Sequence, residues 1–275
     1  MKNIPLFKVY MSKNASKKIN KVLDSGFIGQ GQKVDEFEKK LENLWQAKNV
    51  LTVNSGTSAL SLAYHLIGLK KGDEVITTPI TCLATNSPLL ALSCKIVWAD
   101  VDPLTGLIDP EDVKKKITKR TKAIVCVDWE GRPCDYDALK SFGIPVVQDA
   151  AHSFMTYYKG KHIANSGGDY VCFSFQAIKH LTCIDGGVIK VPKEQFDRAK
   201  LLRWYGFDRE GSSSFRCAQD VKECGFKYHM NDANAAVGIA NLKGAQVNVF
   251  KSQMNAKDFC EFLSKHKIFE FSTPT

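Results

Sequence analysis

Short apolar runs alternate with segments of helical periodicity from about residue 49 onward, and this alternation constrains the fold more than any other feature. The runs are Val50–Val53, Glu74–Thr77, Lys95–Trp98, Ala123–Val127 and Pro145–Gln148. Short runs rich in β-branched residues are typical of strands, and strands that alternate with helices form a mostly parallel sheet covered by helices. Because ligands of such proteins gather at the carboxyl ends of the strands, the residues that follow these runs are the first candidates for a functional site.

Helical patterns precede this block, and further strands and helices follow it. Apolar residues at helical spacing predict one helix over Ala15–Asp24, ending at Gly26, and a second over Val34–Trp45. The later pattern predicts strands over Asp169–Ser174 and Gly187–Val191 and helices near Gln195–Trp204 and Asp232–Leu242. We therefore expect an N-terminal helical arm (1–48), a large α/β domain (49–245) and the start of a small C-terminal domain (246–275).

The composition is that of an ordinary soluble globular protein. Hydrophobic residues make up 44% of the 275 and charged residues 24%, which suffices for one large core and excludes disordered and collagen-like classes. No window approaches the roughly 18 uninterrupted apolar residues of a membrane span, and residues 1–13 lack the apolar stretch of a signal peptide. We therefore expect a cytoplasmic protein without membrane contact.

The nine cysteines bear on whether the chain has disulfides or a metal site, and the net charge of +9 bears on which partners it binds. The cysteines include no Cys-x-x-Cys pair, and Cys217 and Cys224 have no histidine at ligand spacing, so we expect reduced thiols and no metal site. The positive charge favours an anionic partner, which can be a phosphate cofactor, a nucleotide-linked substrate or a nucleic acid. Because the charge is dispersed and no nucleic-acid-binding motif is present, a basic nucleic-acid-binding module is the least favoured alternative.

Two runs after the expected strands carry an amine, an acid and a hydroxyl. Ser174 and Lys179 lie in one run, and Asp149 and His152 lie in the other. Pyridoxal phosphate (PLP) requires such groups: a lysine forms a Schiff base with its aldehyde, a carboxylate keeps the pyridine nitrogen protonated, and a hydroxyl binds the phosphate. A lone lysine is normally solvated, but Lys179 follows an aromatic strand and precedes a glycine-rich return at Asp185–Gly187. The sequence therefore predicts a PLP enzyme.

A phosphate site is expected at the start of the helix that follows the first strand. The segment Asn54–Leu60 combines free amides at a helix start with Gly56, which permits close approach, and Thr57, which offers a hydroxyl. Such a helix start is a suitable cradle for a phosphate. Serine and threonine before an apolar run also cap helices, so the motif by itself leaves a simple helix cap open.

These motifs recur in the same order in a known family. The matching segments are Gly26–Ile28, Phe37–Glu38, Asn54–Leu60, Asp149–His152, Phe173–Phe175 with Lys179, Asp185–Gly187, and Gly225–Asp232 with Ala235, Ala236 and Gly238. Over essentially its whole length the chain resembles the DegT/DnrJ/EryC1/StrS family of PLP-dependent sugar aminotransferases. Each segment is weakly specific, whereas the ordered set is highly specific.

The resemblance implies a fold and a reaction. The implied fold is that of the fold type I PLP-dependent transferases, which resemble aspartate aminotransferase, with a mostly parallel central sheet flanked by helices and a C-terminal small domain. Members of the family work as homodimers with active sites at the subunit interface. The implied reaction moves an amino group from glutamate to a nucleotide-linked keto-deoxysugar in glycan or lipopolysaccharide biosynthesis.

The resemblance also assigns roles to individual residues. Lys179 would be the Schiff-base lysine and proton carrier, and Asp149 would be the partner of the pyridine nitrogen. The phosphate would be held by Gly56, Thr57 and Ser174. His152 would lie beside the cofactor ring, where the family has glutamine or histidine.

Three departures from the family pattern stand out. Many relatives carry an aromatic residue, which stacks on the cofactor ring, where this chain has Cys82; a thiol packs there but offers no π face. Relatives often have asparagine where this chain has Lys227, which is expected to reach the phosphate of the other subunit and keeps a hydrogen-bond donor there. Relatives also continue past the position of Thr275, so the small domain is expected to be truncated here, in a fragment or a shortened homologue.

The sequence indicates the substrate-binding residues less clearly than the cofactor-binding residues. The segment Arg203–Arg209 combines two arginines with aromatic residues, which suits a donor carboxylate or a diphosphate and stacking on a base. Arg203 and Arg209 are therefore the candidates for substrate binding. A surface loop packed by Trp204 is the alternative for the same segment.

Two alternatives within the family remain open. Deoxysugar dehydratases that resemble these aminotransferases carry histidine at the Schiff-base position, and His180 adjoins Lys179. The spacing from Ser174 favours Lys179 as the residue at that position. The second alternative is a truncated homologue that binds the cofactor with little turnover, since closure over the substrate supplies part of catalysis.

Overall fold

The computed structural model describes residues 8–209 and 219–266, and a seven-stranded sheet forms its centre. In sheet order the strands are β1 (Val50–Val53), β9 (Gly187–Lys190), β8 (Tyr170–Ser174), β5 (Val146–Asp149), β4 (Thr121–Val127), β2 (Glu74–Thr77) and β3 (Lys95–Trp98). From β8 to β3 all neighbours are parallel, whereas β9 runs antiparallel to both β8 and β1. The expected α/β class with a mostly parallel sheet is confirmed.

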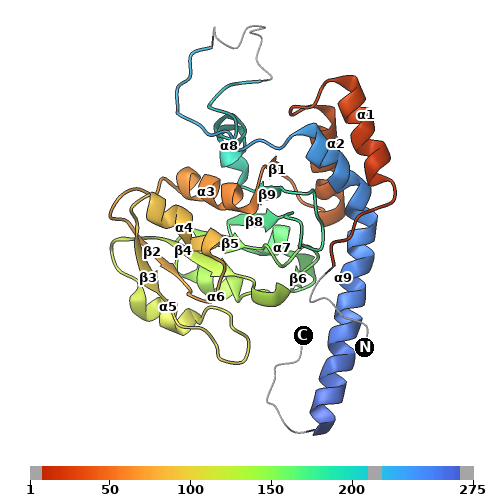
Figure 1. Cartoon of the computed structure of the whole chain (residues 1–275). Coiled ribbons are helices and arrows are strands. Elements are labelled where there is room, and N and C mark those ends of the chain that lie inside the picture. Colours follow the sequence, from red (N-terminus) through yellow and green to blue (C-terminus); the bar gives the residue numbers. More distant parts are fainter. Residues whose placement is uncertain (1–7, 210–218, 267–275) are drawn as a thin grey trace.

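Helices cover both faces of the sheet (Figure 1). One face is covered by α3 (Gly56–Ile67), α4 (Leu83–Ala91) and α8 (Phe196–Leu202). The opposite core includes residues of α2 (Gln32–Trp45), α5 (Pro110–Lys116), α6 (Tyr136–Ser141), α7 (Ile163–Ser166) and α9 (Asp232–His266). Because residues 123–127 of β4 are buried on both faces, their sequence is a continuous apolar run that does not alternate with polar residues.

The remaining elements lie around this core. They are α1 (Ala15–Ser25), a hairpin of β6 (Tyr157–Tyr158) and β7 (Lys161–His162), and the short 3₁₀ turns η1 (Trp129–Gly131) and η2 (Lys193–Gln195). Helix α1 lies beside α9, although the two are far apart in the sequence (Figure 1).

The helix expected over Asp232–Leu242 is much longer in the structure. Helix α9 continues without interruption to His266, and its later part extends away from the sheet (Figure 1). That part carries exposed large apolar side chains, among them Phe250, Phe259 and Phe262. The division into an arm, a large domain and the start of a small domain stays a prediction.

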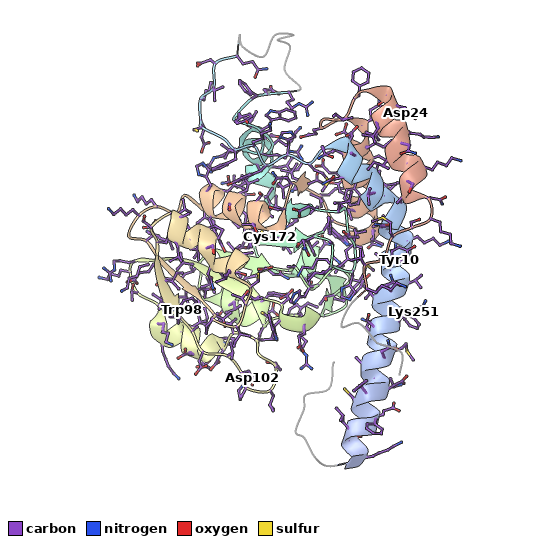
Figure 2. The ribbon with its side chains drawn as sticks, in the orientation of Figure 1. Tyr10, Asp24, Trp98, Asp102, Cys172 and Lys251 are labelled. Atoms are coloured by element: carbon purple, nitrogen blue, oxygen red, sulfur yellow. The ribbon has the colours of Figure 1, made fainter. Side chains whose placement is uncertain are left out.

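Most cysteines in the described ranges lie in the core. Cys172 on β8 lies in the middle of the molecule, whereas Lys251 lies on the protruding part of α9 and Trp98 at the sheet edge (Figure 2). All cysteines in the described ranges are free thiols. Among the helices in the described part of the chain, none combines the length and the apolar character that a membrane span requires.

Candidate active site

The register of the sheet brings the predicted residues to one edge. Asp149 ends β5 and pairs with Cys172, and Ser174 ends β8 opposite Gly187. Gly187 also pairs with Val53, the last residue of β1. Because β9 is antiparallel, its first residue lies beside the last residues of its two neighbours, so the ends of β1 and β8, which are distant in sequence, meet here.

Asp149 is buried and its carboxylate is held by two donors. Only 6% of the residue is exposed. The Thr85 hydroxyl donates to Oδ2 at 2.6 Å, and the backbone N–H of Ala151 donates to Oδ1 at 3.1 Å. Burial raises the pKa of Asp149, while the two donors and the positive charge of Lys179 oppose that rise. The two donors therefore fix the orientation of the carboxylate. Its protonation state depends on these donors and on the charge of Lys179.

Lys179 lies in the turn that follows β8, where its N–H donates to the carbonyl of Gln176 at 2.9 Å. Burial lowers the pKa of its ammonium group, and Asp149 and Cys82 act in the opposite direction. A lowered pKa increases the fraction of neutral amine, which is the nucleophile that an aldehyde requires. Asp149 and Cys82 therefore lie within electrostatic reach of the Lys179 amine.

The start of α3 forms a tight cradle with Ser174. A Cβ atom on Gly56 would lie 2.8 Å from the Ser174 Cβ and 3.2 Å from its Oγ, so only glycine fits. Ser55 caps the helix by accepting from the Ser58 N–H at 3.0 Å, and Thr57 is exposed in the first turn. The free amides of a helix start beside a serine hydroxyl suit a phosphate, so these residues fit the phosphate end of PLP.

His152 lies near Lys179 and packs against an aromatic side chain that the sequence did not single out. Its ring centroid is 5.5 Å from that of Trp129 in η1. Burial, together with the nearby charges of Lys179 and His180, lowers the pKa of His152 to about 4. The imidazole is therefore neutral near pH 7 and able to donate one hydrogen bond and accept another.

Cys82 and Lys227 flank the same region. Cys82 is exposed and immediately precedes α4. The backbone carbonyl of Lys227 accepts from Asn54 Nδ2 at 3.1 Å, so Lys227 lies next to the loop that leads into α3. Its expected reach to the phosphate of a second subunit stays a prediction.

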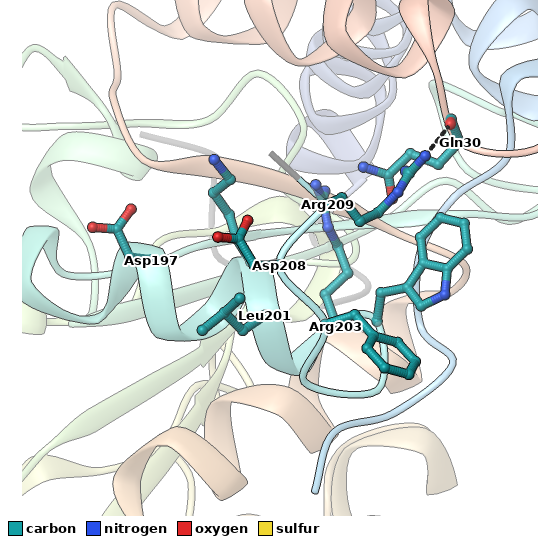
Figure 3. A pocket seen from close by; sticks show the side chains of 9 residues that line it. Gln30, Asp197, Leu201, Arg203, Asp208 and Arg209 are labelled. Atoms are coloured by element: carbon teal, nitrogen blue, oxygen red, sulfur yellow. Dashed lines mark hydrogen bonds between the residues drawn. The ribbon is translucent and has the colours of Figure 1, made fainter. Parts of the chain in front are cut away.

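The two candidate arginines lie elsewhere, at a cavity of about 280 Å³ that includes none of the strand-edge residues (Figure 3). Arg203 is 5% exposed, and its Nη1 donates to Glu38 at 2.6 Å and to the Thr52 carbonyl at 3.0 Å. This ion pair joins the residue that follows α8 to α2 and gives Arg203 a structural role, which does not favour its predicted contact with substrate.

Arg209 lies at the surface of this cavity. Its guanidinium stacks over the Trp204 ring at 4.0 Å and donates to the Gln30 carbonyl at 3.0 Å. The Trp204 ring also stacks on His229, with centroids 3.6 Å apart. The structure therefore shows the packing role of Trp204 that the sequence left open, and substrate binding by Arg209 stays a prediction.

Sequence reasoning missed three residues of the strand edge: Thr81, Thr85 and Trp129. The signal for the threonines was present, since both follow β2 on the side where the parallel strands end. Only the packing of α4 against β5 reveals that Thr85 reaches Asp149, a residue 64 positions later in the chain.

Comparison with known proteins identifies the family of this chain. The model of the DegT/DnrJ/EryC1/StrS aminotransferase family matches residues 9–274. The chain belongs to this family. The resemblance inferred from the ordered motifs is thereby confirmed. PLP is the cofactor of the family, and structures similar to this chain include PLP and PMP forms.

Similar structures support the same fold. AtS13 from Actinomadura melliaura is 41% identical, with a TM-score of 0.90 over 94% of this chain and 72% of AtS13. The sugar aminotransferase CalS13 from Micromonospora echinospora is 34% identical, with a TM-score of 0.89 over 95% of this chain and 73% of CalS13. The fold type I assignment is therefore confirmed.

The relatives are longer than this chain. The protein MJ1066 of Methanocaldococcus jannaschii is 36% identical over 255 residues, which are 88% of this chain and 66% of that protein. The chain thus spans about two thirds of the length of this relative.

A methyl group added at Gly56 tests the cradle. We expect Gly56→Ala to weaken PLP binding about tenfold or more, because overpacking a tight site costs roughly 1–3 kcal/mol. The measurement is an absorbance titration with PLP. Gly29→Ala is the matched control, since a Cβ there meets nothing within 4 Å. Equal affinities for both variants would contradict a phosphate site between Gly56 and Ser174.

Removal of Arg203 tests its structural role. We expect Arg203→Ala to lower the free energy of unfolding by about 3–5 kcal/mol, because Glu38 would keep a partly buried charge without its partner. Urea unfolding measures this, and Glu38→Gln should act similarly, with the double variant losing less than the sum. Arg209→Ala, at an exposed residue, should cost about 1 kcal/mol or less. Unchanged stability with weaker substrate binding in Arg203→Ala would restore the ligand role.

Proposed function

We propose that this chain is a PLP-dependent aminotransferase that moves an amino group from glutamate to a nucleotide-linked keto-deoxysugar in glycan or lipopolysaccharide biosynthesis. The observation that carries the proposal is the convergence of Lys179, Asp149 and the Gly56–Ser174 cradle at one edge of the sheet. A nucleophilic amine, a buried carboxylate and a phosphate cradle are the three groups that the cofactor requires. Membership of an aminotransferase family, with sugar aminotransferases among the similar structures, supports the substrate class.

When bound, PLP withdraws electrons from the substrate carbon that is attached to its reacting nitrogen. The residues of the chain supply what surrounds that chemistry. Lys179 Nζ would hold the cofactor and would move a proton to and from that carbon. Asp149 holds a proton on the ring nitrogen, and neutral His152 binds beside the ring. Gly56, Thr57 and Ser174 would hold the phosphate, and Cys82 would pack against the ring.

We further propose a cytoplasmic homodimer with shared active sites, in which Lys227 contacts the phosphate at the site of the other subunit. In this proposal residues 49–245 form the cofactor domain, preceded by the helical arm 1–48. Residues 246–275 begin the small domain. Several apolar side chains near the site are exposed, including Leu83 at 82% and Ile178 at 50%, and a second subunit would cover them.

The test is the visible absorbance of the purified protein given PLP, before and after glutamate. We expect a yellow species that bleaches with glutamate and is restored by a nucleotide-linked keto-sugar. Glutamine in place of glutamate tests the donor. A chromophore that glutamate leaves unchanged would contradict amino transfer and favour a dehydratase or a cofactor-binding homologue with little activity.

A further inference from the structure

Thr85 joins the buried carboxylate of the site to a second threonine. Thr85 is fully buried in the first turn of α4, and its hydroxyl donates to Asp149 Oδ2 at 2.6 Å. The Thr81 and Thr85 hydroxyls lie 2.6 Å apart. Tyr64 on α3 donates to the Thr85 carbonyl at 2.9 Å and so fixes the backbone that presents the hydroxyl.

The direction of this hydrogen-bond chain follows from the number of protons. An ionised carboxylate only accepts, and a hydroxyl has one proton to donate. Because Thr85 gives its proton to Asp149, the bond between the threonines is donated by Thr81. The chain therefore runs from Thr81 through Thr85 to Asp149, and both donors act to stabilise the negative charge.

The other groups around Asp149 stabilise its negative charge less than Thr85 does. The N–H of Ala151 donates to Oδ1 at 3.1 Å, a longer bond than that from Thr85. Lys179 is the one cation that influences the pKa of Asp149 among the described residues. Tyr64 and Cys172 also face Asp149, and both are buried neutral groups whose own pKa values are raised. Of these groups, Thr85 therefore does most to stabilise the ionised carboxylate against the cost of burial.

We propose that Thr85 is a positioning residue that orients the Asp149 carboxylate and holds it ionised, so that the shared proton stays on the cofactor's ring nitrogen. This inference rests on the proposed function. Without the Thr85 donor, the carboxylate becomes more basic, and the proton moves from the ring nitrogen toward Asp149. The ring then withdraws electrons less strongly.

The experiment compares PLP binding and ring protonation in the full chain and its variants. In Thr85→Val, we expect the acidic limb of the pH profile of PLP affinity to move upward by about one pH unit, the usual size of a shift from one charged hydrogen bond. The ¹⁵N signal of ring-labelled PLP is expected to move toward its unprotonated position. Thr85→Ser should restore both properties.

Two further variants separate this role from general loosening. Thr77→Val removes an equally buried threonine hydroxyl that donates to Asn86 at 3.1 Å and does not contact Asp149, so it should match the wild type. Thr81→Val removes only the outer donor and should shift both properties in the same direction by less. It also provides a readout if Thr85→Val does not fold.

The possible outcomes are distinguishable. Shifts in Thr85→Val and Thr81→Val, with none in Thr77→Val, support the inference. Wild-type behaviour in the Thr85 and Thr81 variants, while the wild type binds PLP, overturns the inference and leaves the proposed function intact. A wild-type protein that does not bind PLP overturns both.

Discussion

Replacement of Lys179 by alanine is expected to abolish transamination and to remove the covalently attached chromophore. Lys179 lies within electrostatic reach of Asp149, and burial lowers the pKa of its amine. Both features suit an amine that attacks the cofactor aldehyde and later carries a proton. Because no other group in the turn after β8 supplies a primary amine, we expect activity to fall to the background of the assay.

Borohydride reduction followed by peptide mapping locates the attachment directly. In the wild type the reduced cofactor should be found on the peptide that contains Lys179, and in Lys179→Ala on none. Lys190→Ala is the matched control: burial also lowers the pKa of Lys190, but this lysine lies on β9, at the end of the strand away from Gly187. Glutamate-dependent transamination that persists in Lys179→Ala would overturn the assignment.

Much of the fold was predictable because each strand is a local pattern. β-branched runs buried on both faces, separated by helix-length segments, leave few arrangements other than a parallel sheet. The length of α9 was not predictable from periodicity, because apolar residues after residue 246 lie around the whole helix and do not form one stripe. Its end therefore had no clear signal in the sequence.

The candidate site was predictable to the extent that its residues follow strands. Asp149 and Ser174 end β5 and β8, so the topology brings them to one edge whatever the details of packing. Contacts that depend on how helices pack were not predictable. Glu38 meets Arg203 across 165 residues of sequence, and Thr85 meets Asp149 across 64. No local pattern encodes either pair.

Replacement of Asp149 by asparagine is expected to lower kcat by about a hundred- to several thousandfold, since loss of one member of a buried charge pair typically costs about 3–5 kcal/mol. Asparagine keeps the size of the side chain and an acceptor for Thr85 but cannot hold the ring nitrogen protonated. Steady-state kinetics measure the loss, and the ¹⁵N signal of bound PLP should show an unprotonated ring.

The stability of the same variant separates chemistry from structure. Because burial raises the pKa of Asp149 above its unfolded value, its contribution to the stability of the cofactor-free protein is full at low pH and is lost as pH rises through the raised pKa. Asparagine has no charge to bury, so at neutral pH Asp149→Asn should unfold with a free energy no lower than that of the wild type. A variant that loses both activity and stability would instead indicate that Asp149 supports the fold. Loss of activity with stability retained would mean that the buried carboxylate lowers the stability of the fold and is kept because the cofactor requires it.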